Sequence, residues 1–157
     1  MHILPEIAEK YKALAEIANA VIQSKGEDIC WDNTINENLT VIGVDTNRVV
    51  WEFKVQRSHC NLLGSLHGGC VATIIDVCSS FSLLTFDGKE KWKYVGVSTD
   101  LAISYMRGIS AGGLARIECN IQRVGKNMAN IHTSIYDEKN NLCYTGSHTK
   151  FCIDSKM

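Results

Sequence analysis

Hydrophobic residues in the first part of the chain follow the spacing of an amphipathic helix. Pro5 suits the first turn of a helix. Apolar residues then recur at the spacing i, i+4, i+7, i+11 and i+14, namely Ile7, Tyr11, Leu14, Ala18 and Val21. Glu and Lys residues lie between them on the opposite face. The pattern predicts one N-terminal helix within residues 1–24, which packs through this stripe on the rest of the protein.

Later segments change from helical spacing to the alternation of strands. Leu39–Asp45 and Arg48–Gln56 are rich in Val, Ile and Trp and flank the turn D-T-N, which predicts a hairpin after a polar connection at 24–38. Apolar and polar residues then alternate in four segments: Val95–Tyr105, Ala115–Ile121, Ala129–Ile135 and Leu142–Ile153. Because the connections between them are short and rich in turn residues, we expect a four-stranded antiparallel meander. The hairpin brings the sheet to about six strands.

Between these two groups lies an apolar run, Asn61–Phe86, which contains no Lys, Arg or Glu and a single acid, Asp76. One carboxylate in an otherwise apolar helix is costly, so we expect it to be functional. The run opens with His67, Gly68 and Gly69, which present bare backbone amides at a helix N-terminus, where partial negative charge is favoured. Because a mid-helix Asp costs about 2.5–3.5 kcal/mol in a bilayer, we expect a buried core helix rather than a membrane span.

Composition excludes several classes of function. The chain of 157 residues is 45% hydrophobic, which fits a single domain at 1–157. A formal charge of −1 without a basic face argues against nucleic-acid binding. The seven cysteines form no C-x-x-C pair, so neither a disulfide framework nor a metal site is expected. Together with an N-terminus that lacks the features of a signal peptide, this predicts a cytoplasmic protein, with mitochondrial association left open.

A mostly apolar helix needs cover on most of its circumference, and a curved antiparallel sheet would supply it. This element order and the motif N-x-x-G-x-x-H-G-G-x-x-x-x-x-x-D resemble the hotdog-fold acyl-CoA thioesterases of the PaaI type. The resemblance covers residues 39–153 and includes G-V-S-x-D at 96–100, Tyr105 with Met106, V-G-K at 124–126 and H-T-K at 148–150. It implies an α+β hotdog fold, with about six antiparallel strands around one long central helix and an extra N-terminal helix.

The chemistry expected from these residues is hydrolysis of acyl-CoA to coenzyme A and a free fatty or aryl acid. Asp76 is the candidate general base on water, or less favourably the nucleophile itself. The Gly68 N–H is the candidate oxyanion donor. Because these two residues are about 12 Å apart along one helix, we expect a homodimer in which Gly68 of one subunit meets Asp76 of the other. The resemblance implies that such dimers pair further into a dimer of dimers.

Other site residues follow from the resemblance. It implies that Asn61 contacts the carbonyl side, that His67 supports the oxyanion end and that Ser98 holds the attacking water. Tyr105 and the turn with Arg123, Gly125, Lys126 and Asn127 are expected to bind coenzyme A, because its phosphates require a cationic rim. No metal and no cofactor besides the coenzyme A thioester substrate are expected. Arg107, His148 and Lys150 are lesser candidates for contact with coenzyme A, and by default we expect them to be exposed charges at a strand end.

Three alternatives remain open at this point. A hotdog dehydratase or hydratase would use the same fold for proton abstraction beside a thioester. A non-catalytic acyl-CoA binding protein would keep the pocket without turnover. Cysteine chemistry is the third, because Cys70 lies in the first turn of the predicted helix, where the pKa of a thiol can be lowered.

Overall fold

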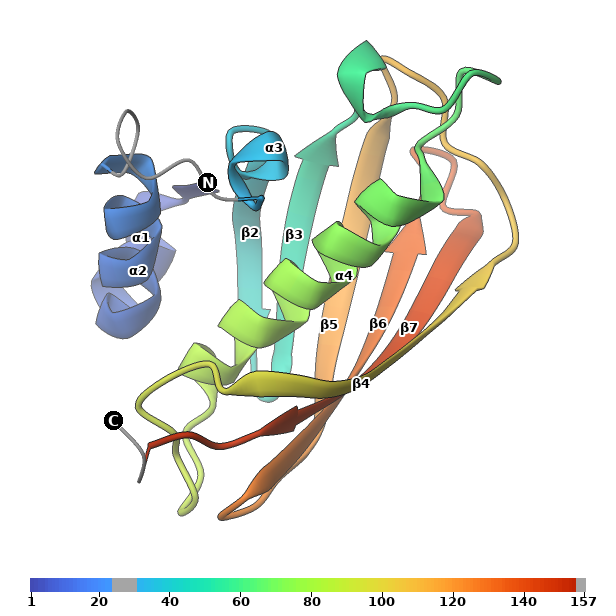
Figure 1. Ribbon diagram of the computed structural model, residues 1–157. Coiled ribbons are helices and arrows are strands. Elements are labelled where there is room, and N and C mark those ends of the chain that lie inside the picture. The colour runs from blue at the N-terminus through green and yellow to red at the C-terminus, as the bar shows by residue number, and fades with distance from the viewer. Residues whose placement is uncertain (24–30, 155–157) are drawn as a thin grey trace.

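A seven-stranded sheet that curves around one long helix dominates the computed structural model, which describes residues 1–23 and 31–154 (Figure 1). The strand order in the sheet is β1-β2-β3-β5-β6-β7-β4. This arrangement confirms the predicted α+β class, with a sheet around a central helix. In chain order the elements are β1 His2–Ile3, α1 Pro5–Lys10, α2 Lys12–Gln23, α3 Asn33–Asn36, β2 Leu39–Asp45, β3 Arg48–Lys54, η1 Arg57–His59, α4 Gly68–Ser82, η2 Leu83–Thr85, β4 Val97–Tyr105, β5 Leu114–Val124, β6 Met128–Tyr136 and β7 Leu142–Phe151.

The central helix α4 crosses one face of the sheet diagonally (Figure 1). Its apolar residues Val71, Ile74, Ile75 and Cys78 are fully buried, and burying a side chain such as Ile contributes about 1.5–3 kcal/mol. The stretch Gly68–Thr85 is long and apolar enough to cross a membrane, but 67% of it is buried inside the fold. The expectation of a core helix is therefore confirmed.

The helix approaches the sheet closely at one glycine of β7. A Cβ built on Gly146 would lie only 2.8 Å from Ile75 Cγ2. Any side chain at this position would therefore force the Ile75 side chain, or the helix that carries it, to shift.

The predicted meander is wrong in one respect. Strands β5, β6 and β7 do form consecutive antiparallel pairs, but β4 pairs with β7 at the edge of the sheet, and β5 pairs with β3. The segment 106–113, predicted to be a hairpin turn, instead crosses from β4 to β5 and packs on the loop before α4, where the Leu66 N–H donates to the Ile109 carbonyl at 2.8 Å. A short turn-rich connection therefore joins strands that are not neighbours.

The N-terminal region also differs from the prediction. The helix breaks at Tyr11, which has a backbone conformation of φ −114° and ψ 68°, so α1 and α2 are two helices. Before them, β1 pairs in parallel with β2 and adds a seventh strand. Three members of the predicted stripe, Ile7, Leu14 and Ala18, are buried as expected. The Val21 side chain and residues 24–30 of the predicted polar connection lie outside the described residues, and the rest of that connection contains α3.

Candidate active site

Asp76 is the one acidic or basic side chain of α4, and it lies at the middle of the helix. Its neighbours Ile75 and Val77 are buried, whereas the Asp76 side chain is 47% exposed. Its Oδ1 accepts a hydrogen bond from Ser80 Oγ, one turn further along the helix, at 3.3 Å, and it also lies 3.3 Å from Ser98 Oγ on β4. The structure thus joins two of the predicted catalytic residues, Asp76 and Ser98, at a carboxylate that remains open to a ligand.

A β-bulge in β4 directs Ser98 toward the helix. The register between β4 and β7 shifts after the pair Ser98–Lys150, because Thr99 is an extra residue before the pair Asp100–Thr149. The bulge reverses the alternation of faces, so Ser98 contacts α4 while Val97 is 48% exposed. Simple alternation would place Val97 on the core face and Ser98 on the solvent face, and this is the opposite of what the structure has.

Two residues that sequence reasoning placed at an exposed strand end belong to this site. His148 is 0% exposed and Lys150 is 3% exposed, so the expectation of exposed charges is wrong. Both face α4 from β7, because Gly146, His148 and Lys150 alternate onto its buried face. His148 Nε2 lies 2.8 Å from Ser98 Oγ, and its Nδ1 lies 2.6 Å from Ser79 Oγ on α4. Lys150 Nζ donates to Ser80 Oγ at 2.7 Å and to Ser98 Oγ at 3.3 Å.

The charges of this cluster are set by its burial. The pKa of His148 is lowered to about 4, first by burial and then by the nearby ammonium of Lys150. The carboxylates of Asp76 and Asp100 oppose this lowering of the His148 pKa. Burial also lowers the pKa of Lys150, which Asp76 raises in part. At neutral pH the imidazole of His148 is therefore uncharged, and the side chains around Ser98 are fixed by hydrogen bonds.

A cavity of about 280 Å³ opens beside this cluster. Its polar wall includes Asp76, Ser80, Ser98 and Lys150, and its apolar wall is formed by Val77, Phe81, Val95 and Val97. Asp32 also lines the cavity, and its pKa is raised by burial and then by the charge of Asp76. Sequence reasoning missed Asp32, because it lies in the connection between α2 and α3, directly before α3, and has no motif around it.

The N-terminus of α4 presents a second group of candidate residues, built mainly from backbone. His67 caps the helix, since its Nδ1 accepts from the Gly69 N–H at 2.9 Å, which leaves a proton of the neutral ring on Nε2. A Cβ on Gly69 would lie 3.2 Å from that nitrogen, so the glycine makes room for the cap. Gly68 is the first helical residue, and its N–H has no acceptor within the helix.

Two further predicted residues adjoin this helix end. Asn61 holds the preceding turn, where its Oδ1 accepts from the Leu63 N–H at 2.9 Å and the Ser65 N–H at 3.3 Å. Tyr105, at the end of β4, donates its hydroxyl to the Gly68 carbonyl at 3.1 Å. Asn61, His67, Gly68 and Tyr105 therefore belong to one end of α4, whereas Asp76 and Ser98 belong to its middle, about 12 Å further along the axis.

Comparisons with known proteins identify the family. The family model described as "Thioesterase superfamily" matches residues 63–144, which include the N-terminus of α4 and Asp76. Human acyl-coenzyme A thioesterase 13 is 31% identical over 113 residues, which are 71% of this chain and 78% of that protein. The chain belongs to the thioesterase superfamily.

Solved structures agree with this assignment. The crystal structure of mouse thioesterase superfamily member 2 superposes with a TM-score of 0.74 at 27% identity and covers 90% of this chain and 96% of that one. The E. coli PaaI protein, at 14% identity and a TM-score of 0.68, covers 94% of this chain and 99% of that one and shares the fold. The resemblance to the hotdog-fold thioesterases is confirmed, and the protein is a thioester hydrolase.

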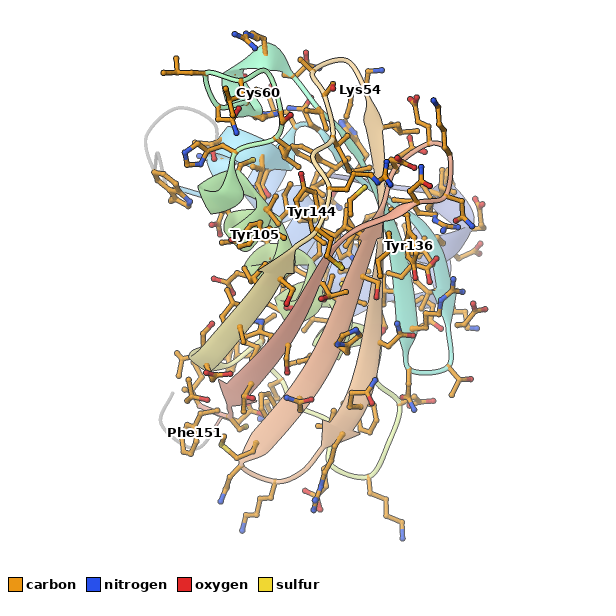
Figure 2. All side chains as sticks on the ribbon, turned by 90° about the vertical axis from the view of Figure 1, so that its right-hand side faces the viewer. Lys54, Cys60, Tyr105, Tyr136, Tyr144 and Phe151 are labelled. Atoms are coloured by element: carbon orange, nitrogen blue, oxygen red, sulfur yellow. The ribbon has the colours of Figure 1, made fainter. Side chains whose placement is uncertain are left out.

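In this thioesterase the residues predicted to bind coenzyme A lie in two separate places. Arg123, Gly125, Lys126 and Asn127 surround a cavity of about 460 Å³ at the turn between β5 and β6. The Trp92 indole N–H donates to the Gly125 carbonyl at 2.9 Å and so fixes the turn. Tyr105 is remote from this turn within the chain, because it pairs with Tyr144 whereas Met128 pairs with Phe151 at the other end of β7 (Figure 2).

Cys70 lacks the environment of a nucleophile in this thioesterase. Burial raises the pKa of its thiol to about 11, and the neighbouring Cys60 adds to this effect. A thiol with so high a pKa is almost entirely protonated at neutral pH, and the thiolate is the reactive form. The structure therefore argues against the cysteine alternative.

Proposed function

We propose that this thioesterase hydrolyses acyl-CoA thioesters to coenzyme A and a free fatty or aryl acid. The observation that carries the proposal is the open Asp76 carboxylate, which lies next to Ser98 and beside a cavity with an apolar wall. An apolar wall suits the carbon chain of an acyl group, and a carboxylate at its edge suits proton transfer from water. The name of the human relative, acyl-coenzyme A thioesterase 13, supports the same substrate class.

The reaction would proceed through a tetrahedral intermediate. Asp76 takes one proton from water while the water oxygen bonds to the thioester carbonyl carbon. The carbonyl oxygen becomes an oxyanion, which accepts a hydrogen bond from the Gly68 N–H at the helix N-terminus. The C–S bond then breaks, the coenzyme A thiolate takes up the proton that Asp76 received, and the acid is released. His67 and Asn61 adjoin the oxyanion end in this proposal, and Ser98 holds the water.

A homodimer completes the site in this proposal. One chain separates Gly68 from Asp76 by about 12 Å, which is too far for one carbonyl group to contact both. Strand β4 is the edge of the sheet, and the residues along it, including Val97 and Tyr105, are largely exposed. An open edge of this kind favours pairing with a second copy. We further propose that two such dimers associate, as the resemblance to the PaaI type implies.

The turn between β5 and β6 is the proposed binding place for the coenzyme A phosphates. Arg123 and Lys126 supply positive charge there, and Gly125 allows close approach of a ligand to the backbone. Replacing Lys126 by Ala should raise KM for acyl-CoA about threefold to tenfold and leave kcat unchanged. An unchanged KM would remove this residue from the proposal.

The cysteines support a reducing compartment such as the cytoplasm. Six of them are free among the residues described, namely Cys60, Cys70, Cys78, Cys119, Cys143 and Cys152.

Release of free thiol from a panel of acyl-CoA substrates tests the function. Wild type should release thiol, and Asp76→Asn should lower kcat at least ~10²-fold with little change in KM. Asp87→Asn is the matched control, because Asp87 is an exposed carboxylate outside the cavity beside Asp76 and should leave turnover unchanged.

The same assay separates the alternatives. Binding of acyl-CoA by wild type without thiol release would establish a non-catalytic binding protein. Loss of an enoyl-CoA double bond without thiol release would establish a hydratase. Equal turnover by wild type and Asp76→Asn would show that the base lies elsewhere.

A further inference from the structure

The buried ring of His148 connects two serines that lie on different elements. Its Nδ1 contacts Ser79 Oγ on α4 at 2.6 Å, and its Nε2 contacts Ser98 Oγ on β4 at 2.8 Å. Both the ring and Ser79 are fully buried. The titratable groups that face the ring are Asp76 on α4, Asp100 on β4 and Lys150 on β7.

The hydroxyl proton of Ser79 determines which nitrogen of His148 carries the ring proton. Ser79 Oγ lies 2.6 Å from the Ile75 carbonyl and donates its single proton to it, as buried serines on helices often do. Ser79 can then only accept from the ring, so the proton of the neutral imidazole lies on Nδ1. Nε2 is consequently an acceptor.

An acceptor at Nε2 fixes the direction of the Ser98 hydroxyl. Ser98 also has one proton, and the contact with Nε2 at 2.8 Å is shorter than the contact with Asp76 Oδ1 at 3.3 Å. When Ser98 donates to the ring, its oxygen is left with two acceptor positions. Lys150 Nζ occupies one of them at 3.3 Å. The second is available to a water molecule bound at Asp76.

We propose that His148 is a positioning residue which, together with Ser79, makes the Ser98 oxygen a hydrogen-bond acceptor for the attacking water. The water then gives one proton to Asp76, directs its other hydrogen to Ser98 Oγ, and turns a lone pair toward the carbonyl carbon. A proton added to Nε2 would reverse the Ser98 hydroxyl, which would then donate toward Asp76 and compete with the water. This inference rests on the proposed function, in which Asp76 and Ser98 handle the water.

Two variants and one control test the inference through turnover. Ser79→Ala removes the acceptor for Nδ1 without touching Ser98 and should lower kcat about fivefold to tenfold, with KM within about twofold. His148→Gln should lower kcat about tenfold or more. Ser82→Ala is matched to Ser79→Ala, because Ser82 is also fully buried on α4 and donates to a backbone carbonyl, that of Cys78, at 2.7 Å. It should leave kcat unchanged.

A second measurement reads the ring directly in the full-length protein. With ¹⁵N-labelled histidine, assigned by loss of its signal in His148→Gln, the NMR spectrum at pH 7 should show a neutral His148 ring with the proton on Nδ1. Ser79→Ala should weaken this preference. A ring that carries its proton on Nε2, or that is charged at pH 7, would overturn the inference.

The outcomes distinguish this inference from the proposed function. If wild type releases thiol and Ser79→Ala has the same kcat as Ser82→Ala, the inference is wrong and the function stands. If wild type releases no thiol, the proposed function is wrong, and the positioning role fails with it. Loss of kcat in Ser79→Ala but not in Ser82→Ala, together with the Nδ1 proton, would support both.

Discussion

The two groups of residues proposed to take part in the reaction lie at the N-terminus and at the middle of α4, and they depend on different kinds of structure. At its N-terminus, α4 offers backbone N–H groups, a histidine cap and a surface turn held by Asn61. At its middle, it offers a carboxylate supported by a buried set of side chains on β4 and β7. The first group is a consequence of local chain geometry. The second requires three elements that are distant in sequence to meet.

This difference determines how each group should respond to substitution. Backbone donors survive the loss of a neighbouring side chain as long as the helix still begins at the same residue. A buried polar cluster depends on all its members, because removing one leaves the others without partners in a medium of low dielectric constant. We therefore expect the middle of α4 to be the more sensitive of the two regions.

The largest expected effect comes from combining subunits with defects in the two regions. As homodimers, Asp76→Asn should reduce turnover at least ~10²-fold and Gly68→Val at least ~10-fold. A heterodimer with one subunit of each kind contains one intact site if the two regions meet across the interface, so it should regain about half of wild-type turnover. Differently tagged, co-expressed and co-purified subunits allow the measurement of thiol release.

The matched control places both substitutions in one subunit and pairs it with a wild-type subunit. Shared sites leave this heterodimer inactive, because each site then contains one defect. If each chain instead forms its own site, this control retains about half of the activity and the first heterodimer none. That pattern would refute the separation of the two regions between subunits.

The next effect concerns the pH dependence of stability. The pKa of His148 is lowered to about 4 in the folded state, from the ordinary value of 6.5. Between these values the unfolded chain binds a proton that the folded protein does not, so this residue's contribution to stability is lost as the pH falls from about 6.5 to 4. Relative to His148→Gln, wild type should lose about 1–3 kcal/mol of unfolding free energy in that interval. Urea unfolding at pH 7, 5.5 and 4.5 measures the difference, and parallel curves would contradict it.

The smallest effect is expected at the N-terminus of α4. Tyr105→Phe removes the hydroxyl that donates to the Gly68 carbonyl but leaves the Gly68 N–H in place. Since one such hydrogen bond contributes about 0.5–1.5 kcal/mol, kcat should fall no more than about tenfold. Thiol-release kinetics provide the measurement. A loss as large as that of Asp76→Asn would mean that the tyrosine takes part directly.

The features that could be predicted from the sequence are those that depend on neighbouring residues. The start of α4 after His67 and the isolation of Asp76 both follow from one continuous segment, 61–86. The hairpin of β2 and β3 also follows from its turn, where Asn47 adopts a positive φ of 59°. Such local signals do not depend on the order of strands in the sheet.

The features that could not be predicted depend on pairing between distant segments. Alternation along β4 places Ser98 on the solvent side, and only the extra residue Thr99 in the ladder reverses this. His148 and Lys150 are buried because β4 lies on the outer side of β7 and α4 lies above it. The motif H-T-K marked these positions through resemblance but gave no sign that they are internal.

The glycine at position 146 has a consequence for all of these contacts. A single methyl group there would meet Ile75 Cγ2 at 2.8 Å, so the Ile75 side chain or the helix that carries it would have to shift. Ser79 and Asp76 lie on that same helix. A shift of the helix would therefore lengthen the distances from Ser79 to His148 and from Asp76 to Ser98 together. Hydrogen bonds weaken when these distances grow by a few tenths of an ångström. The absence of a side chain on one strand therefore helps to set the distance between the Asp76 carboxylate and its neighbours on other elements.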